Sequence, residues 1–308
     1  MVLFGLALLP GCSTDADESN DDGRLNVVAT IGMIADIVED VGGSRLNVEG
    51  LMGPGVDPHL FKASAGDVRV LAGADAVFYN GLHLEAAMAE VLEEMNERKP
   101  TFAVTDGIDR ELLHRSAAFQ NNYDPHVWFD VTMWSSAVEQ VEAALIQLDP
   151  AGETEFRDNA AALRDTLQAL DAWVHSRVAQ VPPELRVLIT AHDAFEYFGK
   201  RYGFDVIGLQ GISTASEAGT GDVQQMVDAI IDRRIPAIFV ETSIPRRTIE
   251  AVQAAVRSRG FEVDIGGSLF SDAMGNPDTP EGRYPGMIRH NVNTIVDALT
   301  AEQSQTVE

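Results

Sequence analysis

The sequence is poor in cysteine and in basic residues. It has 308 residues and one cysteine, Cys12, so it cannot form an internal disulfide. Lysine and arginine number 22 against 48 aspartates and glutamates, giving a formal net charge of −26. Binding a polyanion requires a basic surface, so this balance argues against nucleic acid as a partner and favours the attraction of small cations.

Long apolar runs are also missing, so no segment qualifies as a transmembrane helix. The apolar stretch at residues 2–10 has the length of a signal-peptide core and leads into Leu-Pro-Gly-Cys, which resembles the bacterial lipobox. We therefore predict a lipoprotein signal peptide over residues 1–12, a lipid anchor on Cys12 and a flexible tether over residues 13–23. The folded body would then work outside the cytoplasm, held at the cell membrane. No basic residue precedes the apolar stretch, which leaves open a start codon upstream of Met1.

Beyond the tether, short β-rich segments alternate with helical patterns, which predicts an α/β fold with parallel sheets covered by helices. Four such segments lie in each half, which predicts two similar lobes, each with a mostly parallel four-stranded sheet. The N-terminal lobe would span residues 24–150 and the C-terminal lobe residues 183–308. The expected strands are 25–30, 47–52, 76–81, 101–105, 186–190, 204–209, 237–242 and 261–266.

A single long helix is expected to join the lobes, within residues 151–182. After Gly152 the sequence has no proline or glycine until Pro182, and apolar residues recur with a period near 3.6. About 28 residues at about 1.5 Å each give a helix of roughly 40 Å. A strut of that length is rigid, so we expect only small movements of one lobe against the other.

The tripeptide Asp-Pro-His occurs twice, ending at His59 and at His126. Both histidines follow expected strands, as do His192 and Asp272, and ligands of open α/β sheets bind beyond the carboxyl ends of the strands. Three imidazoles and one carboxylate suit Zn²⁺, Mn²⁺ or Fe²⁺. Position alone does not decide the set, because three further candidates follow strands in the same way: His83, Glu217 and Glu241.

The Asp-Pro pair before each histidine has a physical use. Proline fixes its own φ and keeps the preceding residue extended, so each histidine sits on a stiffened turn. Our hypothesis is that Asp57 and Asp124 orient the histidines by accepting a hydrogen bond from the ring or from the backbone.

Several motifs together resemble the zinc/manganese solute-binding lipoproteins of ABC transporters. They are the lipobox and the segments DPHLF, ADAVFYNGLHLE, DPHVWFD, TAHDAFEYFGKRYG, GLQGISTASEAG and FSDAMG. The resemblance covers nearly the whole chain from about residue 25. It implies two α/β lobes joined by one long helix, with the metal held in the cleft between them. Carried over position by position, the family's ligands fall on His59, His126, His192 and Asp272, which leaves out His83.

The resemblance also implies a role: a binding protein rather than an enzyme, expected to be a monomer. Its cargo would be Zn²⁺ or Mn²⁺, with Fe²⁺ as a further candidate, and its partners an ABC permease and the ATPase of that transporter. Three features are compared with the family pattern, and the last two bear on the choice of metal. Phe61 stands where the family often has tyrosine, the first half lacks a His-rich insertion, and His192 stands where manganese-dedicated members often have glutamate.

Two other functions stay open from the sequence. A zinc hydrolase could use the three histidines, with Asp193 recruited as a general base, provided that one coordination position stays free. A surface adhesin that binds no metal is the second.

Overall fold

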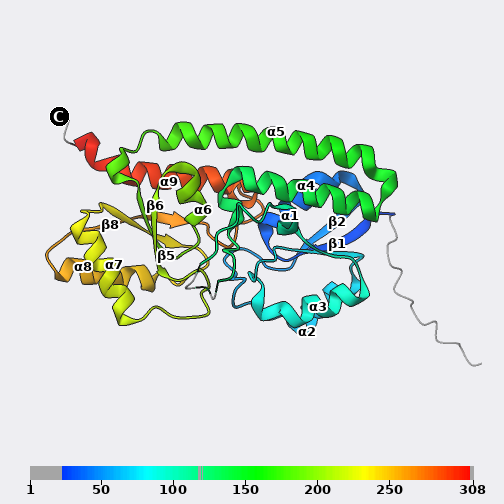
Figure 1. The fold of residues 1–308 in the computed structure, drawn as a ribbon, viewed down its shortest axis with the longest axis horizontal. Helices are drawn as coiled ribbons and strands as arrows, with labels where there is room; N and C mark the ends of the chain where they lie inside the picture. Colours follow the sequence, from blue (N-terminus) through cyan, green and yellow to red (C-terminus); the bar gives the residue numbers. More distant parts are fainter. Residues whose placement is uncertain (1–22, 117–118, 120, 306–308) are drawn as a thin grey trace, which may run out of the picture.

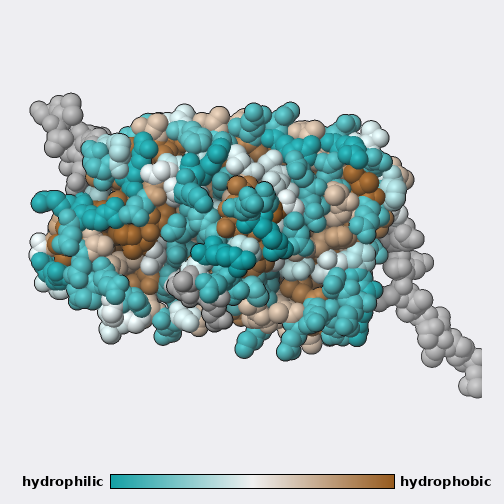
Figure 2. Space-filling view, viewed as in Figure 1, coloured by the Kyte–Doolittle hydropathy of each residue, from teal (hydrophilic) through white to brown (hydrophobic). Residues whose placement is uncertain are grey.

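The computed structural model describes residues 23–116, 119 and 121–305. Cys12 and the expected signal peptide lie outside these residues, as does nearly all of the expected tether. Within the described residues, no helix combines the length and the apolar character needed to cross a membrane. Figure 2 shows hydrophilic residues over most of one face, with smaller apolar areas between them.

The N-terminal lobe is built on one parallel sheet in the order β2-β1-β3-β4. Its strands are β1 (Leu25–Ala29), β2 (Leu46–Gly50), β3 (Ala76–Tyr79) and β4 (Thr101–Ala103). Its helices are α1 (Gly32–Gly42), α2 (Ala65–Gly73), α3 (Ala89–Arg98) and α4 (Val131–Leu148). Helices α2 and α3 lie on one side of this sheet, and α1 and α4 lie on the other (Figure 1).

The C-terminal lobe has the four expected strands, hydrogen-bonded as two parallel pairs, β5-β6 and β7-β8, with β5 beside β7. The strands are β5 (Val187–His192), β6 (Asp205–Gln210), β7 (Ala237–Glu241) and β8 (Asp264–Leu269). The helices are α6 (Glu196–Tyr202), α7 (Thr220–Asp232), α8 (Arg247–Ser258) and α9 (Tyr284–Gln305). Every residue of β5 and β7 is buried, which matches the continuous apolar runs of a sheet covered on both faces.

The long helix α5 (Glu153–Val178) has 26 residues, which corresponds to about 39 Å. It runs along both lobes in Figure 1 and packs against α1 and α4 at one end and against α6 and α9 at the other. Its buried face follows the expected period, with Phe156, Ala160, Leu163, Leu167, Leu170, Val174 and Val178. The expected strut is therefore present.

The apolar core does not stop at the boundary between the lobes. One continuous cluster extends from the β1 sheet through α5 to α9 and includes Phe195, Phe239 and Leu269 of the second lobe. A smaller cluster fills the outer part of that lobe, between the sheet and helices α7 and α8. A shared core of this kind resists wide separation of the lobes, because separation would expose apolar surface to water.

Candidate metal centre

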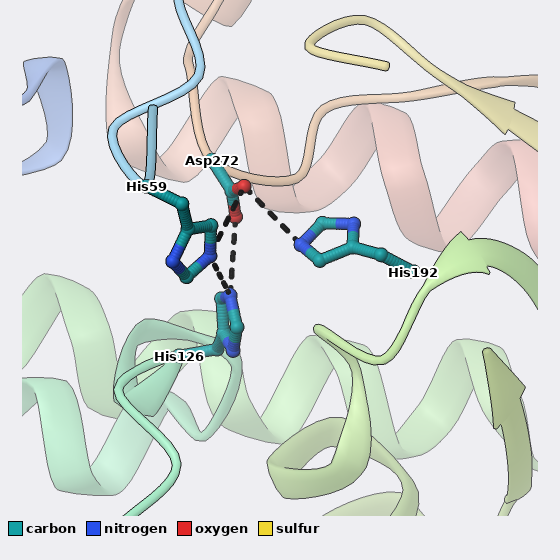
Figure 3. Close-up of side chains that lie close together, drawn as sticks. All are labelled: His59, His126, His192 and Asp272. Atoms are coloured by element: carbon teal, nitrogen blue, oxygen red, sulfur yellow. Dashed lines mark hydrogen bonds and ion pairs between the residues drawn. The ribbon is translucent and has the colours of Figure 1, made fainter. Parts of the chain in front are cut away.

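The four side chains singled out from the sequence meet at one point between the lobes (Figure 3). His59 lies on the loop that follows β2, and His126 immediately precedes the short turn Val127–Phe129 that leads into α4. His192 is the last residue of β5, and Asp272 follows β8. Each lobe therefore supplies two of the four groups.

The separations of the facing atoms fit coordination of one ion. His59 Nε2 is 3.3 Å from His126 Nε2, and the nearest Asp272 oxygens lie 3.3 Å from His126 Nε2 and 3.2 Å from His192 Nε2. One ligand atom from each residue can be chosen so that all four lie within 4.8 Å of one another. Tetrahedral zinc with bonds of about 2.0–2.1 Å places neighbouring ligand atoms about 3.3 Å apart. The three separations of 3.2–3.3 Å given above are therefore close to those between ligand atoms that bind one ion.

Both oxygens of Asp272 face the histidines. Oδ1 is the one nearer His126, while Oδ2 lies 3.2 Å from His192 and 3.8 Å from His59. The carboxylate can thus bind through one oxygen, as zinc accepts, or through both, which raises the coordination number toward the one that harder divalent ions use.

The centre is shut off from solvent. The exposed fraction is 4% for His59, 1% for Asp272 and zero for His126 and His192. Nε2 of His192 and both oxygens of Asp272 lack a well-aligned hydrogen bond to any described residue. Burying such atoms costs about 1–3 kcal/mol each, and a bound cation offsets that cost.

The two Asp-Pro-His turns use their aspartates differently. Asp124 Oδ1 accepts from the His126 backbone N–H at 3.0 Å and lies 2.7 Å from the ring Nδ1 of the same histidine. Asp57 Oδ1 accepts only the backbone N–H of His59, at 2.9 Å. The expected orientation of a histidine ring is thus seen at His126, whereas Asp57 stabilises the turn without contacting the His59 ring.

Glu241 holds the third histidine, His192, through its backbone N–H and its ring Nδ1. Its Oε2 lies 2.5 Å from His192 Nδ1, and its Oε1 accepts from the His192 backbone N–H at 2.9 Å. A carboxylate on the second ring nitrogen fixes the tautomer that presents Nε2 to a metal. Glu241 is thus beside the site without belonging to the group of four. In the sequence, Glu241 stands out as a charged residue at the end of an apolar segment. The structure shows that every residue of that strand, β7, is buried, and a buried charge needs a partner.

Hydrogen bonds across the cleft hold the loops that carry the four residues of the centre. Trp128 Nε1 donates to the Ser271 carbonyl at 3.1 Å, and the Tyr284 hydroxyl donates to the Trp128 carbonyl at 2.6 Å. The Tyr197 hydroxyl donates to the Asp124 carbonyl at 3.0 Å. Residues that neighbour the ligands of one lobe are therefore tied to the other lobe.

Burial and charge separate the pKa values of the three histidines. Burial lowers the pKa of His59 to about 3. For His126, burial is outweighed by the charge and the hydrogen bond of Asp124 and by Asp272, so its pKa rises to about 9. The pKa of His192 is raised well above 6.5 because Glu241 and Asp272 outweigh its burial. The pKa of Asp272 is held well below 3.8, since His192 and His126 outweigh its burial. The centre thus holds protons that a metal ion must displace.

The other candidates lie elsewhere. His83 is exposed, with φ of 68°, and lines a surface hollow of about 580 Å³ that none of the four ligand residues touches. Glu217 is exposed on the loop after β6. Among the described residues, the only group of three or more metal-binding side chains close enough to share an ion is the set of four described above.

Comparison with known proteins agrees with this geometry. The family described as "Zinc-uptake complex component A periplasmic" matches residues 27–298. The chain belongs to the zinc-uptake complex component A family. Within that family it is 47% identical over 298 residues to the manganese-binding lipoprotein MntA of Bacillus subtilis (strain 168), covering 97% of each chain. It is 48% identical over 300 residues to the zinc-binding protein TroA of Treponema pallidum (strain Nichols), covering 96% of each.

The fold agrees with that of a solved member of the zinc-uptake complex component A family. The structure of the periplasmic zinc-binding protein TroA from Treponema pallidum superposes with a TM-score of 0.88 at 49% identity. The superposition covers 90% of this chain and 99% of that one. The α/β architecture expected from the sequence is thereby confirmed.

Proposed function

We propose that this chain is an extracytoplasmic solute-binding protein that captures a divalent transition metal and delivers it to an ABC permease for uptake. The family match to a zinc-uptake component and the names of the two relatives, one manganese-binding and one zinc-binding, support this role. The proposed ligands are His59, His126, His192 and Asp272.

One observation carries the proposal: four metal-binding groups from both lobes converge in a buried centre whose facing atoms are spaced like a coordination sphere. The same burial disfavours a hydrolase, because a substrate has no access to an ion enclosed by four protein ligands. The ion is cargo that the protein carries, and no reaction is needed to explain the site.

We propose that the centre accepts both Zn²⁺ and Mn²⁺. Three imidazoles and one oxygen suit tetrahedral zinc, and the second oxygen of Asp272 allows the larger coordination number that suits manganese. Zinc is the tighter ion in almost any site of this kind. Affinity in vitro therefore does not by itself name the physiological cargo.

The remaining features of the protein are part of the same proposal. Cys12 carries a lipid that holds the protein at the cell membrane, and the chain acts as a monomer with the permease and ATPase as partners. The signal peptide covers residues 1–12 and the tether 13–23. The lobes span 24–150 and 183–308, with the connecting helix region at 151–182.

The test is a competitive titration of the purified chain after it has been stripped with a chelator. We expect one equivalent of Zn²⁺ or Mn²⁺ to bind at neutral pH and to raise the melting temperature, because the ion binds only the folded state. The matched control is His83→Ala, which removes an exposed histidine and should leave binding unchanged. If neither Zn²⁺ nor Mn²⁺ binds, the proposal is refuted.

A further inference from the structure

Of the three histidines proposed as ligands, His59 has the weakest support. The ring of His126 is held by Asp124 at 2.7 Å, and the ring of His192 is held by Glu241 at 2.5 Å. By contrast, Nδ1 of His59 has no hydrogen-bond partner among the described residues, although it is buried. The ring of His59 has one hydrogen-bond contact within this part of the chain, with His126 Nε2 at 3.3 Å, and has no carboxylate behind it, so it is the ring that can turn away from an ion most easily.

His59 also lies nearest the surface. It is 4% exposed, and the next residue, Leu60, is 52% exposed. His126 and His192, with no exposed area, are covered by more of the protein. Of the four residues His59 is therefore the least completely buried, and its turn reaches solvent at Leu60.

A loop of the opposite lobe is fastened to that turn. Residues 211–219 connect β6 to α7, and within this loop residues 215–217 are exposed while Thr214 is only 6% exposed. The Thr214 hydroxyl donates to Asp57 Oδ2 at 2.6 Å, and the other oxygen of Asp57 accepts the backbone N–H of His59. One carboxylate thus joins the His59 turn of the first lobe to a loop of the second.

We propose that Thr214 is a positioning residue whose hydrogen bond to Asp57 latches the 211–219 loop over the His59 side of the centre and limits metal exchange. His59 is the ligand that detaches first when the latch opens. This inference rests on the proposed function, since it concerns exchange of the same metal.

The latch makes a kinetic prediction that a purely structural role does not. An ion crosses the same cover on entering and on leaving, so loosening the cover accelerates both steps and leaves their ratio nearly constant. A hydrogen bond to a carboxylate is strong enough that its loss should accelerate each step about tenfold. If Thr214 only held His59 in place, its loss would instead weaken binding.

The test compares three variants of the purified full chain. Thr214→Val removes the hydroxyl at nearly constant shape, and Thr214→Ser keeps it. Thr242→Val is the matched control, because the Thr242 hydroxyl is buried and has no hydrogen-bond partner among the described residues. Entry of Zn²⁺ is followed by stopped-flow tryptophan fluorescence, since the Trp128 ring lies 5.3 Å from the His126 ring. Release is followed by mixing the zinc-loaded protein with excess chelator.

We expect Thr214→Val to raise both rate constants about tenfold while the dissociation constant changes by less than about threefold. Thr214→Ser and Thr242→Val should match the wild type. Unchanged rates in Thr214→Val would overturn the latch, as would faster release with unchanged entry or the same acceleration in Thr242→Val. If the wild type binds neither Zn²⁺ nor Mn²⁺, the proposed function itself fails, and this result is distinct from the kinetic ones.

Discussion

Replacing Glu241 with glutamine tests whether a charge behind the centre controls how tightly it binds metal. Glu241 contacts His192 twice, through the backbone N–H at 2.9 Å and through ring Nδ1 at 2.5 Å, and both side chains are fully buried. Glutamine has nearly the same shape and can still accept one hydrogen bond. The substitution therefore removes the negative charge while disturbing the packing very little.

The expected magnitude follows from that contact. A hydrogen bond to a charged group contributes about 1.5–3 kcal/mol, roughly twice the contribution of a neutral one. The variant should therefore bind Zn²⁺ about 10- to 100-fold more weakly at a pH where protons do not compete.

The size of this loss should depend on pH. In the wild type, burial lowers the pKa of His192, but Glu241 and Asp272 outweigh it and raise the pKa well above 6.5. Metal must displace that proton, so wild-type affinity rises as the pH rises through the raised pKa. Without the charge of Glu241 the pKa of His192 falls. In the variant His192 is then less protonated, so the metal displaces fewer protons when it binds. The difference in affinity between wild type and variant should therefore be small at low pH and widen as the pH rises.

Isothermal titration with Zn²⁺ in buffers of different ionisation enthalpy measures affinity and proton release together. We expect Glu241→Gln to release fewer protons than the wild type near pH 7.5. Glu217→Gln makes the same chemical change at an exposed residue and should alter neither quantity. Equal proton release in wild type and Glu241→Gln, with an affinity difference independent of pH, would refute the role assigned to the Glu241 charge.

Three further predictions test the ligands and the ties between the lobes. His126→Ala should weaken Zn²⁺ binding at least about 100-fold in a competitive titration, with an unchanged circular dichroism spectrum; near-native affinity would exclude His126 as a ligand. Trp128→Phe removes the donor to the Ser271 carbonyl beside Asp272, so affinity should fall about tenfold, whereas equal affinity would mean that this tie does not position the carboxylate. Arg283→Ala removes the ion pairs with Asp36, Glu39 and Asp40; because the arginine is 45% exposed, calorimetry should show a melting temperature lower by only about 2–4 °C. An unchanged melting temperature would assign these pairs no net stabilisation.

The sequence predicted the architecture well where apolar periodicity was strong. The period near 3.6 predicted the buried face of α5, and β5 begins within one residue of its expected start. Strand β8 ends three residues beyond the expected end at Gly266, because the pair Gly266-Gly267 resembles the start of a turn. Both glycines lie inside the strand. A Cβ atom at Gly266 would come within 2.6 Å of Ala298, and one at Gly267 within 2.4 Å of Thr294, so the strand has glycine at these positions. Both contacts belong to α9, whose close packing on β8 no local pattern reveals.

The candidate site was predictable in kind but not in detail. Position after a strand singled out the four ligands together with His83, Glu217 and Glu241, and only the family resemblance separated them. The identical Asp-Pro-His triplets gave no sign that Asp124 would hold a histidine ring while Asp57 would reach Thr214. The opposite lobe presents a hydroxyl to the carboxylate of Asp57 but to the backbone carbonyl of Asp124, and the Asp57 contact depends on packing between residues 157 positions apart.

The fold itself restricts how the ion can leave. Wide opening of the lobes would have to bend α5 and part the core cluster that joins them, and it would break the hydrogen bonds of Trp128 and Tyr197 across the cleft. Each of these costs adds to the others, and burial of apolar surface alone contributes about 25 cal/mol per Å². Lifting the exposed part of the 211–219 loop breaks the Thr214 bond and the bond from Gln210 to the Ser216 carbonyl, while it leaves the core cluster shared by the lobes and α5 in place. Local opening beside His59 therefore costs less than separation of the lobes, and it exposes the histidine whose ring has the least support.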